Sequence, residues 1–461
     1  MISLKNITQV YFLGIGGIGM SALARYFKHA GFAVSGYDRS ETHLTRELQT
    51  EGISIHYNDQ PEWLKTHLQP DGCLVIYTPA VPADLGERVF VKRNGFTMKK
   101  RSEVLGMICN ELKCCAIAGT HGKTSVSTML AHILYTSKLG CTGFLGGISK
   151  NYQSNLLLAD SSEWVVAEAD EFDRSFLRLF PDLAVITSMD ADHLDIYGSR
   201  EAIVDSFNEF AAQVKNGGTV VTKKGLPIVQ KSTKKISYYS YSLKEKADFY
   251  AENIELEHEA YQFDLVHPKG RIDGMVLNYP GLMNVENAIA ASSLALLAGV
   301  DSEELLIALS GYKGVKRRFD IQYRSEQHVL IDDYAHHPAE LKATIASVRD
   351  MFAGRKVTGI FQPHLFSRTN DFASEFAAEL ETLDEVLLLD IYPAREKPME
   401  GVTSELIFNQ IQNKNKRLVK KEDVVKWASN VNSGVILMMG AGDIDTLVQP
   451  VKQKLMEIEH V

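Results

Sequence analysis

Cysteine is scarce in this chain of 461 residues, and its five cysteines form no CxxC pair. The sequence therefore encodes neither a disulfide framework nor a zinc site, and it suits a reducing compartment. Long apolar runs are missing too, since the nearest candidate, residues 288–300, is shorter than the roughly 18 residues of a membrane span. Residues 10–20 are apolar but rich in glycine, with no cleavage site after them, so we expect no signal peptide. These absences predict a soluble, cytoplasmic protein.

Positive charge is not in excess either, because 49 Lys and Arg residues face 58 Asp and Glu residues, for a net charge of −9. No overall basic field attracts nucleic acid or an anionic membrane, so we expect neither as a partner. Any phosphate group must then be bound by local loops and helix ends. Hydrophobic residues make up 45% of the chain and charged residues 23%, proportions that exclude a disordered or fibrous protein.

Short apolar strands alternate regularly with helical stretches, which is typical of parallel sheets in α/β proteins. The predicted strands include 9–13, 33–37, 73–77, 113–118, 164–167, 183–187, 329–331, 357–361, 386–389 and 435–439. From 248 to 279 the pattern changes to alternation of period two, which is typical of antiparallel hairpins. We predict an α/β fold of three domains: a Rossmann-like N-terminal domain over 1–104, a central P-loop ATPase-like domain with a mixed sheet over 105–313, and a Rossmann-like C-terminal domain over 314–461.

A glycine-containing loop follows the strand 113–118 and precedes a helical stretch, a context in which backbone N–H groups bind phosphate. In this loop Lys123 would reach the β- and γ-phosphates, and Thr124 or Ser125 would supply a hydroxyl to magnesium. The match to a P-loop is not strict, because Ile117 stands where the pattern requires glycine. The predicted ATP-binding residues here are Gly119, Thr120, His121, Gly122, Lys123, Thr124 and Ser125.

A second glycine loop, Gly14-Ile-Gly-Gly-Ile-Gly19, follows the first strand, and Asp38 lies at the distance typical of a dinucleotide-binding fingerprint. NAD is the first interpretation of this pattern. Any other pyrophosphate remains an alternative, because the loop contacts only the two phosphates.

Acidic residues follow the next two strands of the central region. Glu168-Ala-Asp-Glu171 comes directly after the strand 164–167, where a P-loop sheet places a magnesium ligand. The alternative is an exposed acidic turn. His193, in the segment Asp190-Ala-Asp-His-Leu-Asp195, is a candidate ligand for a second metal ion.

Five polar clusters follow strands of the C-terminal region, at the sheet edge where α/β proteins bind ligands. They are Arg317-Arg318-Phe319, Asp332-Asp-Tyr-Ala-His-His-Pro338, Phe361-Gln-Pro-His-Leu-Phe-Ser-Arg368, Tyr392-Pro-Ala-Arg395 and Gly440-Ala-Gly-Asp443. His364 and Arg368 are four residues apart and would share one face of a helix. His336 and His337 are neighbours, so regular structure cannot point both into one site.

Taken in order, the phosphate loop, Glu-Ala-Asp-Glu, Asp-His-Leu-Asp, Arg-Arg-Phe and Asp-Asp-Tyr-Ala-His-His-Pro resemble the motifs of the Mur ligases. These are the ATP-dependent enzymes that form amide bonds in peptidoglycan synthesis. The resemblance runs from about residue 9 to residue 446. It departs from the family at Met283, where a histidine is usual, and at Phe172-Asp173, where Ser-Asp is common.

The resemblance implies three small-molecule substrates: UDP-N-acetylmuramate, ATP and an amino acid, L-alanine. It assigns the UDP-sugar, in place of NAD, to Gly16, Gly17, Gly19, Met20 and Asp38. It adds Asn284, Asn287, Arg318 and Asp333 to the ATP site. It assigns magnesium to Thr124 and Glu168, with His193 on a second ion, and alanine to Tyr334, His364 and Arg368. The implied catalytic residues are Lys123, His193, Arg318, His364 and Arg368.

The chemistry fits these residue types. ATP would convert a carboxylate to an acyl phosphate, and Lys123 with one or two Mg²⁺ ions would neutralise the transferred phosphoryl group. His364 or His336 would then accept the proton of the attacking amine. Three alternatives remain open: a recycling ligase that attaches a preformed tripeptide to the same sugar, an NAD-dependent oxidoreductase, and a nucleotide-responsive switch without catalysis.

Overall fold

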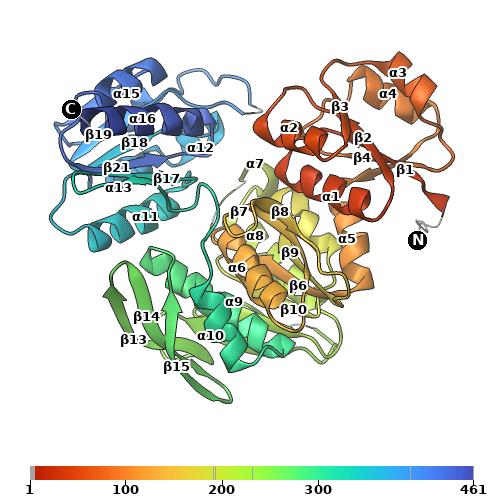
Figure 1. Ribbon diagram of the computed structural model, residues 1–461, viewed down its shortest axis with the longest axis horizontal. Coiled ribbons are helices and arrows are strands. Elements are labelled where there is room, and N and C mark those ends of the chain that lie inside the picture. The colour runs from red at the N-terminus through yellow and green to blue at the C-terminus, as the bar shows by residue number, and fades with distance from the viewer. Residues whose placement is uncertain (1–5, 191, 193, 231, 395, 460–461) are drawn as a thin grey trace. The chain divides into compact units, whose positions relative to one another are not determined.

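The computed structural model describes residues 6–190, 192, 194–230, 232–394 and 396–459. The chain forms two compact units, the first comprising 1–252, 264–275 and 288–312, and the second comprising 253–263, 276–287 and 313–461. Figure 1 shows the α/β architecture, in which helices alternate with the strands of three sheets. Within the described ranges, no helix combines the length and the apolar character needed to cross a membrane.

The N-terminal sheet is parallel and has the strand order β3-β2-β1-β4-β5. Its strands are β1 (Gln9–Leu13), β2 (Ala33–Tyr37), β3 (Ser54–His56), β4 (Cys73–Tyr77) and β5 (Thr97–Lys100). The helices of this region are α1 (Ile18–His29), α2 (His43–Thr50), α3 (Pro61–His67), α4 (Gly86–Arg93) and α5 (Arg101–Glu111). Helix α1 packs against two strands of the central sheet, β7 and β8, so the apolar core is continuous from one sheet to the next.

The central sheet is mixed and has the order β15-β14-β13-β12-β11-β10-β6-β9-β7-β8. Its strands are β6 (Lys113–Ala118), β7 (Thr142–Ser149), β8 (Ser154–Leu157), β9 (Trp164–Ala169), β10 (Leu183–Ile186), β11 (Thr219–Lys223), β12 (Ser237–Ser242), β13 (Phe249–Glu257), β14 (Ala260–His267) and β15 (Gly270–Leu277). The helices are α6 (Lys123–Thr136), α7 (Leu194–Tyr197), α8 (Arg200–Gln213), α9 (Leu282–Ala298) and α10 (Ser302–Ser310), with a 3₁₀ helix at Phe172–Arg178. Strand β6, which leads into the phosphate loop, pairs with β9 and β10 and is buried along nearly all its length.

The C-terminal sheet has the order β16-β17-β21-β18-β19-β20, and only its edge strand β16 is antiparallel to its neighbour. Its strands are β16 (Asp320–Arg324), β17 (His328–Asp333), β18 (Val357–Phe361), β19 (Glu385–Leu388), β20 (Lys416–Leu418) and β21 (Gly434–Met439). The helices are α11 (Pro338–Met351), α12 (Phe366–Asp371), α13 (Ala373–Leu380), α14 (Glu405–Phe408), α15 (Lys421–Ala428) and α16 (Val448–Glu459), with a 3₁₀ helix at Asp443–Leu447.

The predicted fold class is confirmed: two Rossmann-like regions flank a central mixed sheet. Apolar segments bounded by turn residues were placed closely, because β2, β4 and β18 have the predicted bounds. The exact division into 1–104, 105–313 and 314–461 stays a prediction.

Candidate active site

The phosphate loop turns sharply between β6 and α6. Gly122 precedes the helix with a left-handed φ of 80°, and α6 begins at Lys123. Gly119 has a φ of 137°, and a Cβ atom there would lie 2.0 Å from the Thr187 hydroxyl oxygen. Only glycine fits such a backbone this close to its neighbour, so the strand–loop–helix context expected from the sequence is present. The loop N–H of His121 donates to the Ser188 hydroxyl (2.8 Å), which ties the loop to the end of β10.

The Lys123 ammonium group lies over its own loop. It donates to the Gly119 carbonyl oxygen (2.7 Å) and forms an ion pair with Glu171 (2.7 Å). Burial lowers the pKa of Lys123, but the carboxylates of Glu171, Asp170 and Glu168 raise it by more, so its pKa lies above the ordinary value. Burial also raises the pKa of Glu171 to about 7, against the opposing effect of Lys123. Because Glu171 is only 3% exposed, the alternative of an exposed acidic turn is wrong at this residue.

Glu168 is the next-to-last residue of β9 and lies beside the hydroxyl of Thr124, which donates to its carboxylate (3.0 Å). Of the two hydroxyls considered from the sequence, it is therefore Thr124 that lies against the acidic motif. A carboxylate and a hydroxyl are oxygen ligands of the kind Mg²⁺ binds, with waters and substrate phosphates completing its shell, so these residues fit a magnesium ion. No larger cluster of His, Cys, Asp and Glu suited to a metal occurs among the residues that the structure describes. His193 lies outside the described residues.

Gly146, on β7, leaves room for the Glu168 carboxylate. A Cβ atom at this position would lie 1.8 Å from Glu168 Oε2 and 3.0 Å from the Thr124 hydroxyl oxygen. Any other residue would therefore displace the carboxylate. Gly146 belongs to none of the motifs in the sequence, and its one local signal is that a glycine inside a strand can mark close approach.

The glycine loop of the first sheet joins β1 to α1. The N–H groups of Gly14 and Ile15 both donate to the Tyr37 carbonyl oxygen, at 2.8 and 3.0 Å. The N–H of Gly16 donates to the Asp38 carboxylate (2.7 Å). Asp38 thus lies beside the loop at the end of β2, as predicted, and its carboxylate orders the loop backbone. Met20, in the first turn of α1, is buried.

A cavity of about 310 Å³ in the first unit connects the glycine loop to the acidic motif. Its lining residues include Gly17, Ile18, Gly19, Met20, Arg101, Phe144, Leu145, Gly146, Glu168 and Asp170. A group bound on the glycine loop and a group bound beside Glu168 therefore face the same space. Arg101 adds a cation to this wall, 3.7 Å from the Asp170 carboxylate. No sequence motif pointed to Arg101, since it opens α5 without a recognisable pattern.

In the second unit, His364 and Arg368 are brought together with an aromatic cluster. Arg368 Nη1 lies 3.3 Å from His364 Nδ1, and Arg368 is only 5% exposed. The His336 ring is 5.8 Å from the His364 ring and 5.3 Å from the Tyr334 ring. His364 precedes α12 and does not lie on it. Leu365, between His364 and the helix, has a φ of 70°. The two residues therefore meet, but not by sharing a helical face.

The two adjacent histidines of this unit point differently, as expected. His337 is the N-cap of α11, where its ring nitrogen accepts from the Ala339 N–H (3.3 Å), and its ring contacts Phe372. The His336 ring contacts His364 instead. Of the pair, His336 is therefore the one placed with the predicted alanine-binding residues.

The predicted ATP contacts of the second unit are Arg318, Asp333 and two asparagines of α9. The Arg318 guanidinium group lies over the Tyr334 ring, 4.8 Å from its centroid. The Asp333 carboxylate is buried and accepts from the N–H groups of Phe319 (3.0 Å) and Ala335 (2.8 Å), and burial raises its pKa to about 6. It therefore shapes the turn that carries Arg318.

The two asparagines lie in the first turns of α9 and contact each other. Asn287 Nδ2 donates to Asn284 Oδ1 (3.1 Å), and Asn284 Nδ2 donates to the Pro280 carbonyl oxygen (2.5 Å). Asn284 is buried, so its amide serves the local backbone. The roles of these residues toward ATP stay predictions.

Known proteins resemble this chain along nearly its whole length. Three family models match in order: "Mur ligase family, catalytic domain" over residues 9–113, "Mur ligase middle domain" over 117–295, and "Mur ligase, glutamate ligase domain" over 317–442. A UDP-N-acetylmuramate–L-alanine ligase of Parabacteroides distasonis is 50% identical over 455 residues, which is 98% of each chain. The chain belongs to the Mur ligase family.

Solved structures of Mur ligases share its fold. The crystal structure of a UDP-N-acetylmuramate–alanine ligase from Thermotoga maritima has a TM-score of 0.81 and 27% identity, covering 98% of this chain and 99% of that one. A murein peptide ligase from Psychrobacter arcticus has a TM-score of 0.71 at 21% identity, covering 97% and 98%, and shows the fold alone. The resemblance inferred from the motifs is thus confirmed, and a carbon–nitrogen ligase is supported over an oxidoreductase.

Proposed function

We propose that this Mur ligase joins L-alanine to the carboxylate of UDP-N-acetylmuramate at the expense of ATP, in peptidoglycan synthesis. The observation that carries the proposal is the cavity that joins the glycine loop to Glu168, because it allows a sugar-nucleotide carboxylate to lie beside the phosphate loop. The relatives from Parabacteroides distasonis and Thermotoga maritima carry this activity in their names. We also propose the division into domains 1–104, 105–313 and 314–461, each of which contains most of one matched family model.

The reaction needs two steps, because a carboxylate at neutral pH is a poor electrophile. In the first, a carboxylate oxygen attacks the γ-phosphorus of ATP, and the bond to the bridging oxygen breaks to release ADP. In the second, the neutral amine of alanine attacks the acyl carbon, inorganic phosphate leaves with the bonding pair, and the nitrogen loses a proton. The products are the amide, ADP and phosphate.

Residues of the first unit would carry out the first step. Gly16, Gly17, Gly19, Met20 and Asp38 would hold the UDP-sugar, and residues Gly119 to Ser125 would hold the ATP phosphates. The Lys123 ammonium group, which donates to a carbonyl oxygen of its own loop, would donate instead to oxygens of the β- and γ-phosphates. Its positive charge would remain at the loop. Thr124 and Glu168 would hold a magnesium ion, which neutralises the transferred phosphoryl group when bound, and His193 would hold a second.

Residues of the second unit would carry out the second step. Arg368 would hold the alanine carboxylate, and its buried position would limit its motion and keep the amine oriented. Tyr334 and His364 would line the rest of this site, with His364 or His336 accepting the proton of the amine. Arg318 would add positive charge near ATP, held in place by the turn that Asp333 orders, and Asn284 and Asn287 would lie near the adenine.

The test is phosphate release from ATP with magnesium, UDP-N-acetylmuramate and a panel of amino acids. We expect release that requires both the sugar nucleotide and L-alanine, together with an amide product of matching mass. Release with a preformed tripeptide but not with alanine would move the chain to the recycling ligases. Absence of release under every pairing would refute the proposal. Dependence on ATP supports a cytoplasmic location.

A further inference from the structure

One buried side chain, that of Asn155, attaches the glycine-loop helix to the central sheet. Asn155 lies on β8, the edge strand of that sheet. Its amide nitrogen donates to the Ile18 carbonyl oxygen (2.5 Å) and to the Ser21 hydroxyl (2.8 Å). Its amide oxygen accepts from Arg25 Nη1 (2.5 Å). All three partners belong to α1, so the described hydrogen bonds of this side chain all join β8 to the helix that follows the glycine loop.

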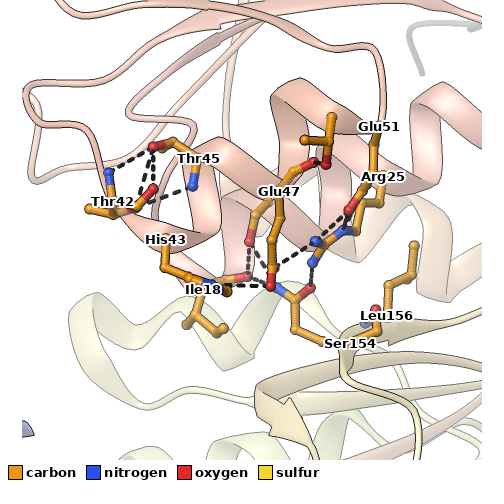
Figure 2. Close-up of polar contacts among 12 residues, drawn as sticks. Ile18, Arg25, Thr42, His43, Thr45, Glu47, Glu51, Ser154 and Leu156 are labelled. Carbon is orange, nitrogen blue, oxygen red and sulfur yellow. Dashed lines mark hydrogen bonds and ion pairs between the residues drawn. The ribbon is translucent and has the colours of Figure 1, made fainter. Parts of the chain in front are cut away.

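Arg25 extends the attachment to α2. Its Nη2 donates to Glu51 (2.6 Å) and to Glu47 (3.2 Å), and its side chain is 10% exposed. Figure 2 shows the Glu47 and Glu51 side chains reaching the Arg25 guanidinium group. Helix α2 also contacts the loop itself, because a Cβ atom at Gly16 would lie 2.7 Å from the Thr45 methyl group. Hydrogen bonds and ion pairs therefore connect α1, α2 and β8, and α2 also packs closely against the loop.

The same strand pair leads to the opposite wall of the cavity. Strand β8 pairs antiparallel with β7, with Leu156 opposite Phe144, and β7 pairs with β9, which carries Glu168. Phe144 lines the cavity, as does Ile18, whose carbonyl oxygen Asn155 holds. The separation between the glycine loop and Glu168 thus depends on where Asn155 holds α1.

Apolar packing alone does not define that separation. The rings of Tyr26 and Phe144 meet at 5.4 Å between α1 and β7, and such contacts supply adhesion that is largely non-directional. Hydrogen bonds to a buried amide have strict requirements for distance and angle. Because the Asn155 amide bonds to both the first turn of α1 and Arg25, it opposes sliding and rotation of the helix on the sheet.

We propose that Asn155 is a positioning residue for the transfer of the phosphoryl group from ATP to the sugar carboxylate. This rests on the proposed function above. Reacting atoms must be held about 3–3.5 Å apart, and a misplacement of about 1 Å can cost a hundredfold in rate. Without the Asn155 contacts, each substrate keeps its own binding residues, but the two sets are no longer held at a fixed separation.

The test is Asn155→Ala, with amide formation measured at saturating substrates and the binding of each ligand measured separately by calorimetry. We expect kcat per folded molecule to fall about a hundredfold, as for a misplacement of about 1 Å. The dissociation constants of UDP-N-acetylmuramate and ATP should each change less than about threefold, because an effect confined to the reacting geometry leaves separate binding intact. Ser21→Ala removes one of the three contacts and should lower kcat about fivefold, as the loss of about 1 kcal/mol implies. It decides the question if Asn155→Ala does not fold.

Asn208→Ala is the matched control. The Asn208 amide also makes three described hydrogen bonds, to Val204, Pro227 and Val229, but it joins α8 to a loop and does not line the cavity. A purely structural role predicts losses of stability in both variants, larger for the fully buried Asn155 than for the partly buried Asn208, and no change in kcat per folded molecule in either. Unchanged kcat in Asn155→Ala or, if that variant does not fold, in Ser21→Ala would overturn the proposal, as would an equal loss of kcat in Asn208→Ala. A wild-type protein that forms no amide would instead refute the proposed function.

Discussion

Replacing Gly146 with alanine is the sharpest available test of the Glu168 site. The added Cβ atom would lie 1.8 Å from Glu168 Oε2 and 2.7 Å from the carboxyl carbon, both shorter than the 3.0 Å that real Cβ contacts respect. Gly146 has no left-handed φ, so alanine introduces no backbone strain of its own. The perturbation therefore falls first on the Glu168 carboxylate, and the next atom it meets is the Thr124 hydroxyl oxygen at 3.0 Å.

The carboxylate oxygen must retreat by about 1.2 Å or more to clear the methyl group, since it would start 1.8 Å away and real Cβ contacts are not shorter than 3.0 Å. Such a shift breaks the 3.0 Å hydrogen bond from Thr124 and moves the predicted magnesium ligand. We expect kcat to fall about a hundredfold, the cost of a misplacement of about 1 Å in an active site. The assay is phosphate release across a magnesium titration, with circular dichroism and melting temperature to check the fold.

A double-mutant cycle identifies the cause. Glu168→Asp withdraws the carboxylate by one methylene group, so Gly146→Ala should cost much less in that background than in the wild type. Gly311→Ala is the control, because a Cβ atom there meets nothing closer than 3.5 Å. Activity of Gly146→Ala within about threefold of wild type, or additive effects of the two substitutions, would show that the added methyl group does not displace Glu168.

Three further predictions concern charged groups. Lys123→Ala should lower kcat by about 10³-fold or more while the fold survives, because removal of a cation at the transferred phosphoryl group has costs of this order. The fold should survive because the pKa of Glu171 is raised to about 7, so this carboxyl can take up a proton once Lys123 is gone. Near-normal turnover of Lys123→Ala would exclude this ATP site. Arg368→Ala should raise the apparent KM for alanine far more than that for ATP, and equal effects in steady-state kinetics would contradict the carboxylate clamp. Burial raises the pKa of Asp332 to about 7, so the folded second unit keeps a proton that the unfolded chain releases near pH 3.9. Stability from this group is therefore present below about pH 4 and lost as pH rises to about 7, and Asp332→Asn should flatten that slope in melting temperature against pH.

Much of the fold followed from local patterns. The apolar segments Cys73–Tyr77 and Val357–Phe361 are strands with the predicted bounds, because a short buried run between turn residues has few other solutions. The phosphate loop was found for a similar reason, since Gly119 and Gly122 adopt backbone angles that their neighbours could not, directly before a helix start. In both cases the residues that decide the structure are adjacent in the chain.

The site was found less completely, because its parts meet only through packing. The sequence left open which of His336 and His337 faces His364. In the structure His337 is the N-cap of α11, so it is His336 whose ring contacts His364. Arg101 reaches the cavity because β5 and α5 place it there, and nothing in its flanking residues announces that.

The sequence by itself determined the fold class, the two glycine loops and the choice of charged candidate residues such as Lys123 and Glu168. Each of these depends on patterns within a few positions of the chain. Only the tertiary structure decided that Gly146 leaves room for Glu168 and that Asn155 holds α1. Ser21, one of the residues of α1 that Asn155 contacts, is 134 residues away in the chain. Residues this distant meet because the sheets and helices pack in one arrangement. Nothing in the sequence of β8 around Asn155 indicates which residues this side chain will contact, so such contacts become visible only once the chain is folded.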